Sequence, residues 1–143
     1  MTAPRSRKET KLYDKYQLTV DKTRCSFCHL KENGDQVVEE TDSFLVVRNL
    51  FPYSIWDGQE VVDHLLVVPT LHTDTLSKLP PAAAAEFLQI IGRYESQSYN
   101  VYTRAPGSHM KSIVHQHTHL IKTVGLPKKF VFLLRKPYIR VTL

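Results

Sequence analysis

The sequence predicts an α+β fold in which a single antiparallel sheet carries one long helix on one face. Three features indicate it: short apolar and β-branched runs recur along the chain, one strong helical stripe lies in the second half, and no internal repeat interrupts them. With 143 residues, 42% of them hydrophobic and 23% charged, the chain suits one compact domain with its own core.

The N-terminal part predicts a short helix followed by a turn-rich segment. Residues 7–19 place one leucine and two tyrosines at helical spacing, which favours a short helix. Residues 22–35 carry both cysteines of the chain and end in a turn at Asn33-Gly34.

The next part predicts three strands. Residues 37–40 and 44–48 form a predicted hairpin, because both are rich in strand-forming residues and a polar triplet separates them. Residues 49–63 contain a proline and a glycine and are expected to form a long loop. The nearly continuous apolar run at 64–69 predicts a central, buried strand.

The second half predicts the long helix and the remaining strands. Two prolines at 80–81 suit a first helical turn, and the helix is expected to reach about Gln97. Residues 99–104 and 114–121 predict strands separated by a loop, and the C-terminal stretch from 130 predicts strand structure broken at its proline. The apolar stripe of the helix consists of Phe87, Ile90, Ile91 and Tyr94.

The chain has a net charge of +5, from 19 basic and 14 acidic residues, and basic residues gather at both ends. This balance suits an anionic substrate such as a nucleotide, or weak contact with nucleic acid, although a solvated surface accounts for it equally well. The gathered residues are Arg5, Arg7, Lys8, Lys11, Lys128, Lys129, Arg135, Lys136 and Arg140.

Membrane and secretory signals are both missing from the sequence. No apolar run approaches the roughly 20 residues that span a bilayer. The basic, polar start lacks the apolar segment of a secretory signal. We therefore expect a cytoplasmic protein without membrane contact.

The only two cysteines, Cys25 and Cys28, are separated by two residues in RCSFCHL. A disulfide across so short a loop would stabilise little. A redox pair of this spacing commonly opens a helix within a βαβ pattern, which this segment lacks. The pair therefore favours half of a zinc site, whose two further ligands could be histidines.

Three of the seven histidines, His115, His117 and His119, alternate within VHQHTHLI. In a strand, alternate side chains point to one face, so these rings would form one row. Neutral imidazole attacks phosphorus, transfers protons or ligates metals near neutral pH. The row by itself leaves two alternatives open, an exposed polar strand face and a three-histidine metal site.

Several sequence elements together resemble the histidine triad (HIT) family of nucleotide hydrolases and transferases. The alternating histidines lie in HQHTHLI at 115–121, which has the family's pattern. They follow HLLVVPTLH at 64–72, which resembles the family's strand of the form H-x-L-V-V-P-x-x-H. The C-x-F-C at 25–28 also recurs in the family, so the resemblance extends from Cys25 to Thr123.

Two features depart from the family pattern. Gln116 and Thr118 stand where the family prefers apolar residues, so the face that they occupy is expected to be wetter or hydrogen-bonded to a neighbour. The stretch 49–63 is longer than in compact members. Its opening, NLFPY, is similar to the branch that contains dinucleoside polyphosphate phosphorylases and galactose-1-phosphate uridylyltransferase.

The resemblance implies a HIT-like antiparallel sheet with one long helix packed on it and a short N-terminal helix. It divides the chain into a basic N-terminal extension at 1–20, a HIT domain at 21–125, and a C-terminal extension at 126–143 that packs on or extends the domain. It also implies an enzyme that uses no organic cofactor.

Catalytic roles follow from the resemblance for four histidines. His117 matches the family's nucleophile, which would carry a nucleotidyl group as a covalent intermediate. His119 matches the histidine that hydrogen-bonds the phosphate or protonates the leaving group. His115 is the first histidine of the row, and His64 matches a fourth that lines the phosphate site.

Substrate contacts are implied for four other residues. Ser112 stands at the family's serine or threonine position, Lys111 replaces the usual glutamine, and Arg104 is near a usual asparagine. Asn49 stands where the family contacts the ribose, although a turn role before Phe51 fits it as well.

Zinc-bearing members of the family also suggest how the cysteine pair is completed. Their ligands match Cys25, Cys28, His72 and His115, so we expect a structural Zn²⁺ in a closed tetrahedral site. His29, next to the second cysteine, is a competing ligand. No role is assigned to His109.

The leading functional hypothesis is a nucleotide hydrolase that cleaves at the α-phosphate of a dinucleoside polyphosphate or a nucleoside phosphoramidate. The alternatives are a nucleotidyltransferase or phosphorylase that uses phosphate as acceptor, an enzyme on adenylated DNA, and a non-catalytic nucleotide-binding protein. The third histidine favours hydrolysis, NLFPY favours transfer, and the lack of a zinc-finger pattern after the triad disfavours nucleic acid. Because family members are commonly homodimers, we also expect a homodimer.

Overall fold

The computed structural model describes residues 5, 7–21, 23–32, 34–125, 131–135 and 138–142. Several sequence expectations fall wholly or partly outside this part of the chain. They are the turn at Asn33-Gly34, the basic residues Lys128, Lys129 and Lys136, and the break at Pro137.

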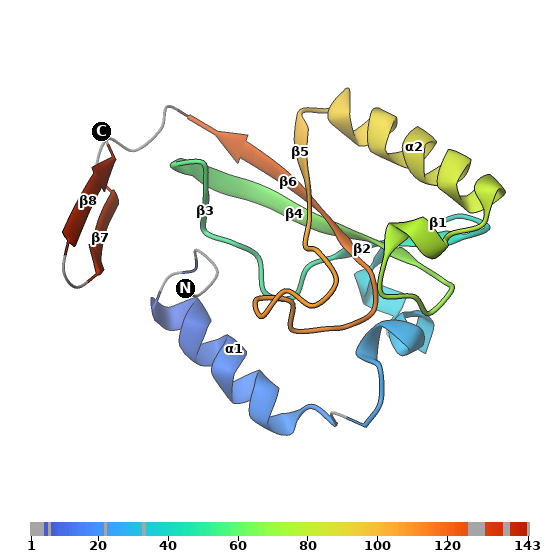
Figure 1. Cartoon of the computed structure of the whole chain (residues 1–143), viewed down its shortest axis with the longest axis horizontal. Coiled ribbons are helices and arrows are strands. Elements are labelled where there is room, and N and C mark those ends of the chain that lie inside the picture. The colour runs from blue at the N-terminus through green and yellow to red at the C-terminus, as the bar shows by residue number, and fades with distance from the viewer. Residues whose placement is uncertain are drawn as a thin grey trace.

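A six-stranded antiparallel sheet forms the centre of the fold. Its strands run in the order β1-β2-β4-β6-β5, and β3 pairs with β4 outside this path (Figure 1). The α+β prediction is confirmed, and the β1–β2 hairpin has the expected bounds. The strands are β1 (Val37–Glu40), β2 (Phe44–Arg48), β3 (Ile55–Trp56), β4 (Gln59–Pro69), β5 (Tyr99–Thr103) and β6 (Thr118–Val124).

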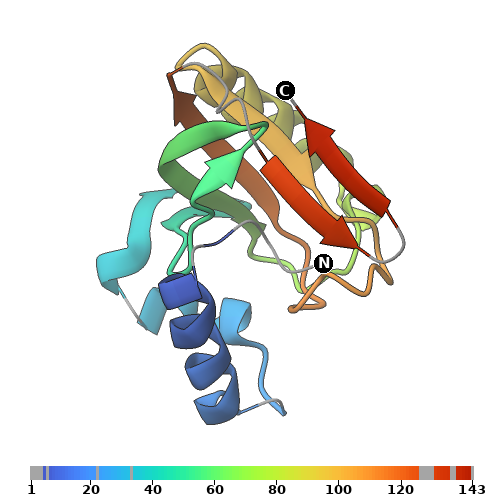
Figure 2. The ribbon, with the colours of Figure 1, turned by 90° about the vertical axis from the view of Figure 1, so that its left-hand side faces the viewer.

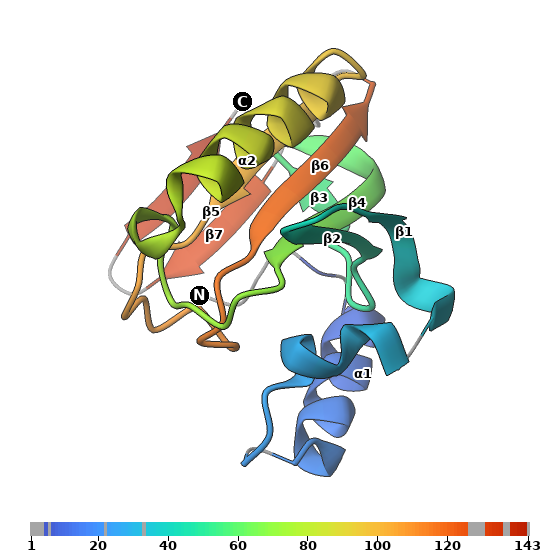
Figure 3. The same ribbon diagram turned by 90° about the vertical axis from the view of Figure 1, so that its right-hand side faces the viewer.

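The long helix α2 (Pro81–Glu95) covers one face of this sheet (Figures 1 and 3). Ile90, Ile91 and Tyr94 of its stripe are buried there, and Phe87 packs beside them. The predicted helix and its apolar stripe are therefore confirmed. The strand residues that face the helix are Phe44, Val46, Leu65, Val67 and Leu120.

The opposite face of the sheet is covered by the N-terminal part of the chain. The alternate residues of β2 and β4 form a second apolar cluster there, with Leu30 of the 3₁₀ segment η1 (Ser26–Glu32). Helix α1 (Arg7–Thr19), which has the bounds expected from the sequence, lies farther out on this side, away from α2 (Figures 1 and 3). Two further 3₁₀ turns are η2 (Gly34–Gln36) and η3 (Leu76–Lys78).

The stretch 49–63, expected as a loop, contains a hairpin instead. β3 pairs antiparallel with the start of β4, and the two residues between them, Asp57 and Gly58, have φ angles of 48° and 76°. Positive φ at both central positions is typical of a type I′ hairpin turn, for which Asp-Gly is a favoured pair. The loop prediction holds for residues 49–54 and is wrong for 55–63. It took the glycine as a general breaker rather than as part of this turn.

Strand structure in the C-terminal segment is confirmed. β7 (Val131–Arg135) and β8 (Tyr138–Thr142) pair antiparallel in a two-stranded sheet of their own (Figures 1 and 2). That this segment packs on or extends the domain stays a prediction. Within the described ranges, no helix has the length and hydropathy needed to cross a bilayer.

Candidate active site and metal centre

The alternating histidines approach the face of the sheet that α2 leaves open. His119, in β6, pairs with Leu66, which belongs to the apolar cluster on that face. The ring of His117 lies 5.2 Å from that of His119 and 5.1 Å from that of Phe27 in η1. His117 and His119 therefore lie side by side in the interior, between the sheet and the N-terminal segment.

The predicted strand at 114–121 is too long at its start, because β6 begins only at Thr118. The residues before it bond to the end of β4 and to the loop that follows β4 instead of continuing the ladder. His115 Nε2 lies 2.9 Å from the carbonyl oxygen of Pro69, and the Gln116 N–H donates to the Thr73 carbonyl at 2.6 Å. These contacts hold the segment in place without strand pairing.

The ring of His117 has a defined proton position. Its Nδ1 lies 2.9 Å from the His115 carbonyl oxygen, which can only accept, so Nδ1 carries the proton. Burial lowers the pKa of His117 to about 4, and the ring is neutral near pH 7. Nε2 therefore keeps its lone pair, as a nucleophilic imidazole requires.

His64 and His119 form a second pair, in which hydrogen bonds also determine the ring nitrogen that carries the proton. The backbone N–H of Tyr53 donates to His64 Nδ1 at 3.1 Å, and His64 Nε2 lies 2.9 Å from His119 Nδ1. A neutral His64 consequently donates from Nε2, which leaves the proton of His119 on its own Nε2. This Nε2 is buried and has no hydrogen-bond partner among the described residues.

Burial keeps this second pair uncharged as well. It lowers the pKa of His64 to about 4, with the positive charge of Arg5 adding to the effect. It lowers the pKa of His119 farther, helped by the neighbouring His64. At neutral pH, His119 is therefore a hydrogen-bond donor at Nε2, and not a cation.

The two cysteines and two of the histidines form a compact cluster beside this site. The ligand atoms of Cys25, Cys28, His72 and His115 all lie within 4.8 Å of one another. Nδ1 of His115 lies 3.5 Å from Cys25 Sγ and 3.6 Å from Cys28 Sγ, and Nδ1 of His72 lies 3.1 Å from Cys28 Sγ. Two thiols and two imidazoles at this spacing could hold one tetrahedral metal ion.

Local structure prepares this cluster for a metal. The Cys28 N–H donates to the Cys25 carbonyl at 3.1 Å, which turns the chain and places both sulfurs on the same side. His115 donates from Nε2 to Pro69, so its Nδ1 lone pair faces the thiols, an arrangement typical of metal-ligating histidines. The donor set fits zinc, and both cysteines are free thiols.

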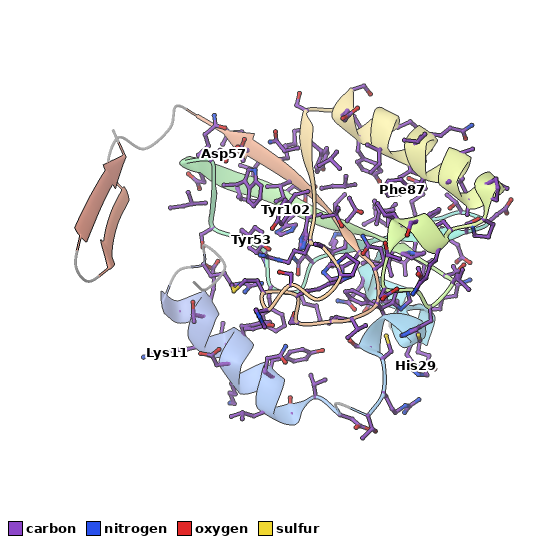
Figure 4. All side chains as sticks on the ribbon, viewed as in Figure 1. Lys11, His29, Tyr53, Asp57, Phe87 and Tyr102 are labelled. Atoms are coloured by element: carbon purple, nitrogen blue, oxygen red, sulfur yellow. The ribbon has the colours of Figure 1, made fainter. Side chains whose placement is uncertain are left out.

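The competing ligand, His29, points elsewhere. Its Nδ1 pairs with Glu32 at 2.8 Å, and its Nε2 lies 3.3 Å from a nitrogen of Arg24. Among the residues described, the four-residue cluster does not include it. In Figure 4, His29 lies on the short helical segment at the edge of the molecule.

A cavity of about 330 Å³ opens beside the paired histidines. Both His117 and His119 line it, and so do three of the four residues expected to bind substrate, Asn49, Arg104 and Ser112. His64 is not part of this wall among the described residues and instead supports His119 from behind.

Two of the expected substrate residues have a second contact that fixes their side chains. Asn49 Oδ1 accepts a hydrogen bond from the Phe51 N–H at 3.0 Å, as expected for a turn residue, and Asn49 also lines the cavity. Arg104 donates to the Tyr53 hydroxyl at 3.2 Å and covers the ring of Tyr102 at 5.3 Å. Both tyrosine rings, labelled in Figure 4, pack against the ring of His119, with centroids 5.6 Å and 5.7 Å away.

Lys111, the fourth expected substrate residue, turns away from the cavity. Its Nζ donates to the Asp74 carbonyl and to Gln116 Oε1, both at 3.0 Å. Gln116 in turn donates to Thr103 Oγ1 at 2.6 Å, and Thr103 donates to the carbonyl oxygen of His117 at 3.2 Å. The expected hydrogen-bonded environment of Gln116 is thus present, and it holds the backbone of His117.

Sequence reasoning missed the wall that α1 contributes to the cavity. Five residues of this helix line it together with Arg5, which precedes the helix. The tyrosine stripe of α1 was visible in the sequence, but nothing in the pattern indicated which surface it would cover. The lining residues of α1 are Thr10, Tyr13, Asp14, Tyr16 and Gln17.

Comparison with known proteins identifies the family of this chain. A family model described as the HIT domain matches residues 30–125. The chain therefore belongs to the histidine triad family. No match is found among curated proteins.

Solved structures with the same fold include three proteins of the histidine triad type. A HIT family hydrolase from Clostridium thermocellum has a TM-score of 0.54 at 16% identity, over 71% of this chain and 91% of that one. A histidine triad protein from Clostridium difficile has a TM-score of 0.52 at 22% identity, over 76% and 97%. A zinc-bound histidine triad family protein from Mycobacterium smegmatis has a TM-score of 0.52 at 19% identity, over 71% and 76%. At these identities the likeness establishes the fold alone.

Proposed function

We propose that this protein is a nucleotide hydrolase that cleaves at the α-phosphate and forms a covalent intermediate on His117. The observation that carries the proposal is the His117 ring, whose Nδ1 is tied to a carbonyl while its neutral Nε2 belongs to a residue of the cavity wall. A neutral, oriented imidazole is the nucleophile that a displacement at phosphorus needs.

In the first step, His117 Nε2 attacks the α-phosphorus, and the bond from phosphorus to the leaving group breaks. The positive charge that develops on the ring is stabilised by the Nδ1–H bond to the His115 carbonyl. His119 offers its free Nε2–H to an oxygen of the phosphate or of the leaving group. Arg104 and Ser112 line the same cavity and supply further positive charge and a hydroxyl donor.

In the second step, water attacks phosphorus and the bond between phosphorus and His117 breaks. The electron pair returns to Nε2, so the imidazole is again neutral, and the proton lost by water balances the one taken up by the leaving group. Burial keeps His117 neutral at the start of each cycle, because it disfavours the imidazolium form.

We further propose that Cys25, Cys28, His72 and His115 hold a structural zinc ion. The support is the spacing of their ligand atoms, within 4.8 Å of one another, and the soft donor set. Such an ion stabilises the fold by joining its ligands and offers no position to substrate. It would anchor His115, whose carbonyl orients the nucleophile.

Turnover measurements test the catalytic proposal. Wild type is incubated with adenosine and guanosine dinucleoside polyphosphates and phosphoramidates, each with and without inorganic phosphate. We expect a nucleoside monophosphate as product, and loss of turnover in His117→Ala by at least about a thousandfold, the size typical for a removed covalent nucleophile. His29→Ala is the matched control and should keep wild-type activity, because its ring pairs with Glu32.

Two results would change the proposal. A nucleoside diphosphate product that depends on added phosphate would identify a phosphorylase with the same intermediate. Nucleotide binding by wild type without any turnover would indicate a non-catalytic nucleotide-binding protein.

A further inference from the structure

Helix α1 lies outside the part of the chain that matches the HIT domain, yet it forms one wall of the active-site cavity. The match begins at residue 30, and α1 ends at Thr19. In Figures 1 and 3 this helix runs across the molecule on the side of the sheet opposite to α2. The family domain alone therefore does not complete this cavity.

Several contacts hold α1 against the segment that follows Asn49. The ring of Phe51 packs against Tyr13 and Tyr16, with ring centroids 5.3 Å and 4.8 Å apart. Arg5 donates two hydrogen bonds to the Phe51 carbonyl, at 3.1 Å and 2.9 Å, and its guanidinium covers the Tyr13 ring at 4.5 Å. The Ser54 hydroxyl also donates to the carboxylate of Glu9 in α1. Asn49 lines the cavity together with His117 and His119. The segment that begins at Asn49 therefore contacts both α1 and the wall of the cavity.

Two polar side chains of α1, the exposed Asp14 and the half-buried Gln17, line this cavity one helical turn apart. Neither forms a hydrogen bond or ion pair with another residue in the described part of the chain. A carboxylate can only accept hydrogen bonds, so a ligand that satisfies Asp14 must present donors. Near η1 the wall includes three apolar side chains, Phe27, Leu30 and Val47, beside the polar Ser26 and Gln36. The apolar part suits a flat ring.

Building on the proposed function, we propose that α1 recognises the nucleobase of the substrate, and that Asp14 selects guanine. Guanine presents adjacent N1–H and N2–H donors, which match the two oxygens of one carboxylate. Adenine offers only its amino group beside a ring acceptor, which a carboxylate repels. The cavity volume of about 330 Å³ is typical of a binding site for one small ligand, so a single nucleotide would occupy it.

Binding of nucleoside monophosphates to the full chain tests this proposal separately from catalysis. GMP and AMP are titrated calorimetrically into wild type and Asp14→Asn, which exchanges one acceptor oxygen for a donor group at the same shape. The matched control is Asp57→Asn, which makes the same charge change at the β3–β4 turn, far from α1 (Figure 4). Asparagine tolerates the positive φ of that turn.

We expect wild type and Asp57→Asn to bind GMP roughly tenfold more tightly than AMP, the size typical of one bidentate pair to a base edge. Asp14→Asn should bring the two affinities close together, mainly by weakening GMP. Equal affinities in wild type, or an unchanged ratio in Asp14→Asn, would overturn the role of α1 while leaving covalent catalysis by His117 intact. Failure of wild type to bind either nucleotide would overturn the role of α1 and count against a nucleotide substrate altogether.

Discussion

Gln116 and Thr118 flank His117 and are both buried and polar, yet substitutions at them should affect stability in opposite directions. Gln116 bonds to Lys111 and Thr103, so Gln116→Leu leaves both partners without an acceptor or donor. We expect it to lower the free energy of unfolding by about 1–2 kcal/mol. Urea denaturation at fixed pH measures the change.

For Thr118→Val we expect a change in stability of the opposite sign. The Thr118 hydroxyl is buried and has no hydrogen-bond partner among the described residues. Replacing it with a methyl group of similar shape should raise the free energy of unfolding by about 1 kcal/mol, because the cost of an unsatisfied buried hydroxyl disappears. Loss of stability in Thr118→Val would mean that the hydroxyl has a partner in solution.

From the sequence, the neighbours of a single residue could be predicted only where the residue belongs to a short motif. The histidine row was expected to lie together, and the two cysteines to share a metal site with histidines, and the structure brings both groups together. One tight turn orients the cysteines. Of the row, only His119 lies in β6, and His115 is held by a contact with Pro69 rather than by strand pairing. Lys111 could not be placed in this way. It lies in an irregular loop, where its contacts with Asp74 and Gln116 depend on how distant segments pack.

At the scale of elements, the cysteine–histidine cluster joins the segment around the start of η1 to the loop after β4 and to the segment before β6. We predict that purified wild type contains about one zinc per chain, that Cys28→Ser loses it, and that His29→Ala keeps it. Elemental analysis of dialysed protein measures the content. The expected difference arises because Cys28 lies 3.1 Å from the His72 nitrogen, whereas His29 pairs with Glu32.

Removal of the metal with a chelator tests whether the proposed zinc ion stabilises the fold. Because the proposed ion would bind the folded chain and join three elements, its removal should lower the melting temperature of wild type. Cys28→Ser should already melt at the lower temperature and show no further change with chelator. Equal zinc content in all three proteins, or a chelator effect that is the same in Cys28→Ser, would contradict the assignment of these ligands.

The elements that the sequence predicted well are those with a strong local pattern. The stripe of α2 has helical periodicity, and one polar triplet separates the valine-rich strands β1 and β2, so local sequence sufficed. The β3–β4 hairpin was missed although Asp57-Gly58 is a hairpin signal, because β3 is only two residues long. The position of α1 depends on Phe51, which is distant in sequence and has no periodicity that points to the helix.

At the scale of the whole molecule, membership of the histidine triad family leads us to predict a homodimer. Strand β5 lies at an edge of the described sheet, and its Val101 side chain is exposed, which leaves a surface that a second copy can cover. Size-exclusion chromatography with light scattering should give twice the mass of one chain. A single-chain mass at micromolar concentration would contradict the prediction.

The central claim is that this domain transfers a nucleotide through His117, and the mass of a trapped intermediate tests it most directly. Wild type is mixed with substrate, quenched within the turnover time, and digested for mass spectrometry. We predict an increase equal to one nucleotidyl group, located on His117 and absent from His117→Ala. Turnover without an adduct on His117 at any quench time, or an adduct that persists in His117→Ala, would contradict the account.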